Sequence, residues 1–92
     1  MANTASPKRK ITFSLTAPGA GTVELLGEFT GWEQAPIALR PSKSGKWSKQ
    51  LSLAPGRYEY RFRVDGHWCD DPACGARVPN GFGSENCVRV VE

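Results

Sequence analysis

The clearest alternation of apolar and polar side chains runs from Tyr58 to Trp68. Its apolar members are Tyr58, Tyr60, Phe62 and Val64, and its polar members are Glu59, Arg61 and Arg63. Because successive residues of a strand point to opposite faces, the apolar set is predicted to fill a core and the polar set to face water or a ligand. Asp65-Gly66 predicts a two-residue hairpin turn, with Trp68 just past it. An indole at a hairpin tip beside arginines suggests a binding surface.

Shorter runs of the same kind predict further strands at 10–16, 22–28, 36–39, 46–53 and 86–91. Turns rich in Pro and Gly separate these runs, and no window has the period of a helix. The stretch 70–84, rich in Asp, Pro, Gly and Asn, is predicted to be irregular. Strands at this spacing predict an all-β, immunoglobulin-like β-sandwich.

The chain has 92 residues, which is the size of one domain with one core. We expect a flexible tail at 1–9 and a folded domain at 10–92. The basic residues near the N-terminus are not followed by an apolar run, which argues against a secretory signal or a membrane span and favours a cytoplasmic protein. The formal charge of +3 is too weak to identify a nucleic-acid binder by itself.

Three cysteines without an export signal favour free thiols over a disulfide framework. Zinc-type donors occur at His67, Cys69, Cys74 and Cys87, but the short Cys-x2-Cys spacing of common structural sites is missing. We therefore expect no metal and no cofactor, leave a Cys69–Cys74 bridge open, and expect Cys87 to pack inward.

Catalytic motifs are poorly represented. Asp70 and Asp71 are adjacent, so their side chains diverge in an extended chain and do not suit an opposed glycosidase pair. No nucleophile elbow or phosphate loop occurs, and Asp71 before Pro72 is typical of a turn. The prediction is a protein that is not an enzyme.

Three segments together resemble a known family: GEFTGW at 27–32, LAPGRYEYRF at 53–62, and VDGHW at 64–68 followed by Asp71-Pro72. Their order and spacing are similar to carbohydrate-binding module family 48, which includes the glycogen-binding module of the AMP-activated protein kinase β subunit. The resemblance covers about residues 11–91. It implies an early-set β-sandwich that binds α-1,4-linked glucans of the glycogen or starch type.

The resemblance also implies site residues. Trp32 and Trp68 match the two tryptophans on which the family stacks sugars, and Arg61 stands where a lysine usually contacts sugar hydroxyls. The segment 80–86 resembles the final binding segment of the family. In that segment Phe82 would replace a leucine, while Ser84 and Asn86 would supply hydrogen bonds.

Physical chemistry supports the same residues independently. A glucose ring has a face of C–H groups and a rim of hydroxyls, so its binder needs flat apolar platforms flanked by donors and acceptors. Trp32 and Trp68 lie beside Gly and Asp-Gly, which favours exposure, whereas the pattern around Trp47 favours the core. Arg61 and Arg63 share an outward face, where each could be solvated or pair with Glu59 or with a carboxylate across a strand. Arg63 is expected to do one of these, whereas from the residues alone Arg61 could equally meet a ligand. Phe82 could equally meet a ligand or close one end of the sandwich.

Three classes of function follow. The favoured one is a non-catalytic α-glucan-binding module, which could bring a glycogen-metabolism enzyme or a kinase to the polymer. A protein-interaction or oligomerisation module would use the sandwich edges or the tryptophan face instead. A single-stranded nucleic-acid binder would use residues 7–10, Arg61, Arg63 and the aromatics, and its affinity would collapse with salt.

Overall fold

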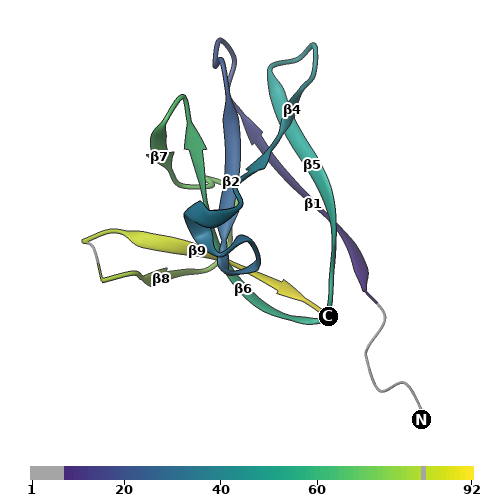
Figure 1. Ribbon diagram of the computed structural model, residues 1–92, viewed down its shortest axis with the longest axis vertical. Helices are drawn as coiled ribbons and strands as arrows, with labels where there is room; N and C mark the ends of the chain where they lie inside the picture. Colours follow the sequence, from purple (N-terminus) through teal and green to yellow (C-terminus); the bar gives the residue numbers. More distant parts are fainter. Residues whose placement is uncertain (1–7, 82) are drawn as a thin grey trace.

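The computed structural model describes residues 8–81 and 83–92, which form two antiparallel sheets packed face to face (Figure 1). The smaller sheet has the order β1-β5-β4, with β1 at Arg9–Thr16, β5 at Lys46–Leu53 and β4 at Arg40–Pro41. The larger has the order β3-β2-β6-β9-β8, with β7 beside β6. Its strands are β2 Val23–Gly27, β3 Ile37–Ala38, β6 Gly56–Val64, β7 His67–Cys69, β8 Arg77–Pro79 and β9 Glu85–Val91. The predicted all-β sandwich is confirmed.

The core between the sheets is aromatic. Tyr60 and Phe62 of β6 are 1% and 0% exposed, and the Tyr60 ring packs edge-on against Phe13 of β1 with centroids 5.0 Å apart. Trp47 of β5 is buried, and its Nε1 donates a hydrogen bond to the Ala17 carbonyl at 3.1 Å. Cys87 is fully buried. The predicted inward positions of Tyr60, Phe62, Trp47 and Cys87 are confirmed.

The predicted Asp65-Gly66 turn is also confirmed. Both residues have positive φ, 49° for Asp65 and 85° for Gly66, as a two-residue hairpin requires. The Asp65 carboxylate accepts hydrogen bonds at 2.8 Å from the backbone N–H groups of Gly21 and Thr22. The β6–β7 hairpin is therefore tied to the loop that precedes β2.

Two features past that turn differ from the prediction. Trp68 is not in a loop at the hairpin tip but within β7, directly opposite Arg63 of β6. The stretch 70–84 is not wholly irregular, because β8 lies inside it and pairs with the start of β9. Three-residue strands such as β7 and β8 depend on hydrogen bonds to a longer neighbour, so they carry too little alternation of their own to be detected.

The two short helical segments are 3-10 turns, η1 at Glu28–Thr30 and η2 at Trp32–Gln34. Across the part of the chain that the structure describes, no helix is long and apolar enough to span a bilayer. Nor do those residues contain a group of three or more His, Cys, Asp or Glu side chains that could hold a metal ion. The three cysteines are free thiols.

Candidate functional site

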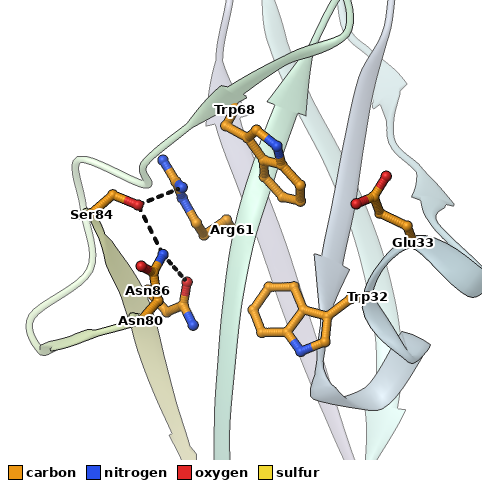
Figure 2. Close-up of a pocket in the computed structure, with 7 residues that line it drawn as sticks. All are labelled: Trp32, Glu33, Arg61, Trp68, Asn80, Ser84 and Asn86. Carbon is orange, nitrogen blue, oxygen red and sulfur yellow. Dashed lines mark hydrogen bonds between the residues drawn. The ribbon is translucent and has the colours of Figure 1, made fainter. Parts of the chain in front are cut away.

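A cleft of about 650 Å³ opens on the outer face of the larger sheet (Figure 2). Its lining consists of Trp32, Glu33, Arg61, Trp68, Asn80, Ser84 and Asn86. Five of the six site residues expected from the sequence thus meet at one place. The sixth, Phe82, lies outside the described residues. Glu33 and Asn80 were not among the predicted site residues.

Trp68 forms one wall of the cleft and is 42% exposed. Its strand pairs with β6 so that the indole lies on the same outer face as Arg61 and Arg63. The two guanidinium carbons are 5.5 and 5.7 Å from the ring centre, within the range of cation–π attraction. The indole therefore rests on two arginines and keeps part of its surface free.

Trp32 approaches the same opening from the loop after β2, and Figure 2 shows both indoles bordering one space. Gly31 and Trp32 both have left-handed backbones, with φ of 66° and 58°. This conformation is uncommon for a bulky residue and needs support. The Thr30 hydroxyl supplies it, lying 2.9 Å from the Trp32 carbonyl and 3.0 Å from that of Gly27, and accepting from the Gly27 N–H at 3.1 Å.

Gly27 sets how closely this loop approaches β6. A Cβ at Gly27 would lie 2.7 Å from the Glu59 carbonyl oxygen and 3.0 Å from the Tyr60 Cβ. Both contacts are shorter than, or at the limit of, what packed atoms allow. Glycine is thus required here by space, since its backbone is extended.

Arg61 is anchored rather than free. Its Nη2 lies 2.9 Å from the Asp70 carboxylate, and its Nη1 donates to the Ser84 hydroxyl at 3.2 Å. Asp70 also pairs with Arg77 at 3.2 Å. The side chain of Arg61 is only 14% exposed. It therefore supports Trp68 and positions Ser84. Its Nε is buried, so only the remaining N–H groups of its two Nη atoms could serve a ligand.

Asparagines link the loop before β9 to the sheet. The Asn80 side-chain amide donates to the Ser84 hydroxyl at 2.9 Å and to the side-chain oxygen of Asn86 at 3.1 Å. Asn86 is 7% exposed and donates in turn to Glu59 at 3.1 Å. Both polar atoms of the Asn86 side chain therefore make hydrogen bonds that hold the loop against the sheet. Asn80 is the first residue of the segment 80–86, which resembles the final binding segment of the family. Its place in that segment was the only indication from the sequence that Asn80 belongs to the site.

Arg63 connects the two walls of the cleft. It pairs at 2.9 Å with Glu24, its cross-strand neighbour on β2, and at 3.4 Å with Glu33, the residue after Trp32. Of the two alternatives expected for Arg63, solvation or pairing across a strand, the structure shows the pairing. The hydrogen bond that Arg63 donates to the Glu24 carboxylate raises the pKa of Arg63 above its ordinary value. Both arginines at the cleft are therefore neutralised by carboxylates, and the 71% exposed Glu33 adds negative charge.

Comparison with known proteins decides the family. The family model described as "Glycogen recognition site of AMP-activated protein kinase" matches residues 10–92. The chain belongs to this family. This match confirms the resemblance to a glycogen-binding module that the sequence showed.

Individual relatives carry the module as a small part of a longer chain. It is 43% identical over 77 residues to protein PTST of Arabidopsis thaliana, covering 79% of this chain and 26% of the relative. It is 34% identical over 76 residues to the 1,4-alpha-glucan branching enzyme GlgB of Rhodopirellula baltica, covering 75% of this chain and 10% of the enzyme. For PTST homolog 2 of Arabidopsis the identity is 40% over 81 residues, covering 87% of this chain and 15% of the relative.

Proposed function

We propose that this module binds α-1,4-linked glucan in the cleft of Figure 2, stacking glucose rings on Trp32 and Trp68, and that it does so without chemistry of its own. The observation that carries the proposal is the placement of two indoles on one opening with hydroxyl and amide groups beside them. The indoles suit the C–H faces of the sugar, and the polar groups suit its hydroxyl rim. Family membership supports the same ligand class.

The charge at the cleft argues against a nucleic acid. A phosphate backbone needs uncompensated Lys or Arg, because counterion release supplies most of its affinity. Here Arg61 is paired with Asp70, and Arg63 with Glu24 and Glu33. A neutral polymer suits such a surface, so its affinity should not change with salt.

Carboxylates near the cleft already have structural partners, which supports binding over hydrolysis. Asp70 is shared between Arg61 and Arg77. Asp71 is buried, accepts a hydrogen bond from the Tyr60 hydroxyl at 2.7 Å, and accepts another from the Ala73 N–H at 2.9 Å. The turn predicted at Asp71 is thereby confirmed, and its carboxylate faces the core side of β6 rather than the cleft.

Titration calorimetry with β-cyclodextrin tests the proposal. Covering about 70 Å² of an indole face at about 25 cal/mol/Å² contributes about 1.8 kcal/mol. Trp32→Ala and Trp68→Ala should therefore each weaken binding by roughly twentyfold. Val90→Ala, which trims an exposed side chain away from the cleft, is the matched control and should bind like the parent. Unchanged affinity in both tryptophan variants, with circular dichroism intact, would refute stacking at this cleft.

A further inference from the structure

The charges of the chain are divided between the two sheets. All nine Asp and Glu residues lie outside 8–16 and 40–53, the segments that form the smaller sheet and the loop joining β4 to β5. The same two segments hold Lys8, Arg9, Lys10, Arg40, Lys43, Lys46 and Lys49, out of twelve basic residues in the chain. The smaller sheet is therefore a basic surface with no carboxylate of its own.

The basic residues of the two sheets differ in their partners. On the larger sheet, Arg57, Arg61, Arg63 and Arg77 each pair with a carboxylate. On the smaller sheet, Lys10, Arg40 and Lys46 have no carboxylate within salt-bridge distance among residues 8–81 and 83–92. Their charge is available to a partner.

One edge of this sheet is also open. β1 pairs with β5 along its whole length and with no other strand of the described chain, so one row of its backbone N–H and C=O groups lacks a strand partner. Its start lies next to the chain end, where Arg9 Nε donates to the Glu92 carbonyl at 2.9 Å. The start of β1 thus lies beside the end of β9, and the two strands belong to different sheets.

A groove of about 290 Å³ separates these two strands. Its lining includes Thr12 and Ser14 of β1, Val88 and Arg89 of β9, and residues 73–75 of the loop before β8. Arg89 lies over the Phe13 ring at 5.3 Å, with no carboxylate within salt-bridge distance among the described residues. The one carboxylate in the groove, Asp71, is 7% exposed and held by Tyr60 and Ala73.

We propose that the open edge of β1, together with this groove, binds an acidic polypeptide segment in extended conformation by strand addition. Main-chain pairing to β1 would give affinity, and carboxylates of the segment would lie near Lys10 and Arg89. The edge favours a polypeptide, because neither a nucleic acid nor a lipid can continue a β-ladder. The smaller sheet also lacks an exposed aromatic or aliphatic anchor, since the large exposed hydrophobics among the described residues are Trp68 and Val90 of the larger sheet. This proposal does not depend on glucan binding.

Fluorescence anisotropy with a labelled alternating Thr-Glu decapeptide tests it at low salt. We expect saturable binding, with new amide protection along β1 by hydrogen exchange. A Thr-Glu decapeptide methylated at every backbone nitrogen carries the same charge but has no backbone N–H to donate to β1, so it should bind at least about tenfold more weakly. Lys10→Gln and Arg89→Gln should each weaken the Thr-Glu peptide by about threefold to tenfold. Val90→Glu makes the same change in net charge on the outer face of β9, and it should leave the affinity for the Thr-Glu peptide unchanged.

Several results would overturn the proposal. The first is no binding of the Thr-Glu peptide. The second is equal binding of the N-methylated peptide or of an oligothymidylate of equal length. The third is an equal loss of affinity in Val90→Glu and Arg89→Gln. β-Cyclodextrin titrations of the same variants keep this outcome separate from the glucan proposal, because Lys10 and Arg89 do not line the cleft.

Discussion

Thr30 is the residue on which the position of the first cleft tryptophan depends. Its hydroxyl is buried and contacts backbone groups of both Gly27 and Trp32, across the left-handed pair Gly31-Trp32. A left-handed tryptophan persists only when its surroundings hold it there. One hydroxyl group thus links the end of β2 to the indole that borders the cleft.

Thr30→Val keeps the shape of this side chain and removes its hydrogen bonds. Leaving the Gly27 N–H without an acceptor should lower the free energy of unfolding by about 1–2 kcal/mol. The substitution should also lower the affinity for β-cyclodextrin by about threefold to tenfold, because Trp32 loses its support. Urea denaturation and calorimetry measure the two effects, and Thr30→Ser should restore both. Unchanged glucan affinity in Thr30→Val would show that Trp32 does not need this hydroxyl.

Individual site residues could be predicted where a residue type has few other uses. Trp32 and Trp68 next to Gly and Asp-Gly are such cases, and both border the cleft. Glu33 could not be found, because a lone glutamate in a loop carries no pattern, and its role comes from Arg63 on a distant strand. The partners of Arg61 could not be identified from the sequence either, because Asp70 and Ser84 come close to it only in the folded sheet.

At the scale of elements, the long alternating strands were predicted well, and of the short ones only β3 was expected, within 36–39. β5 begins and ends where the predicted strand does, at Lys46 and Leu53. β6 begins at Gly56, one residue before the strand that the alternation predicts at 57–64. β4, β7 and β8 were missed, although β7 carries Trp68. Their existence depends on neighbours β5, β6 and β9, which the local sequence does not encode.

The elements bearing the two tryptophans are joined through Arg63, which contacts Trp68 and also pairs with Glu33 of η2. Arg63→Gln and Glu33→Gln should each lower the affinity for β-cyclodextrin by about threefold. The double variant should bind β-cyclodextrin no more weakly than Arg63→Gln alone. Glu24→Gln is the matched control, because it breaks the other pair of Arg63 and leaves the link to η2. Additive losses in the double variant would show that the two walls are not coupled through this ion pair.

For the molecule as a whole, the two sheets enclose titratable groups in an aromatic core. Burial and the neighbouring thiol of Cys74 raise the pKa of Cys87 from 9.0 to about 12. Burial, with the hydrogen bond to Asp71, raises the pKa of Tyr60 in the same direction. Both groups stay protonated in the fold while the unfolded chain ionises, so their contribution to stability is present below pH 9 and is lost as the pH rises above it.

Alkaline pH should therefore destabilise the sandwich. Between pH 7 and pH 10, ionisation of the unfolded Cys87 thiol alone should lower the free energy of unfolding by about 1.4 kcal/mol. Urea denaturation at both values measures the change. Cys87→Ala should be less stable at pH 7 but should lose less on going to pH 10. An equal pH dependence in the variant would mean that this thiol is not responsible.

The central claim is that one glucan lies against both Trp32 and Trp68, and nuclear Overhauser contacts between ligand and protein test it most directly. With maltoheptaose bound, the ring C–H protons of glucose should give cross-peaks to the indole protons of Trp32 and Trp68. The buried indole of Trp47 should give none. Cross-peaks that avoid both cleft indoles, with maltoheptaose demonstrably bound, would contradict the account.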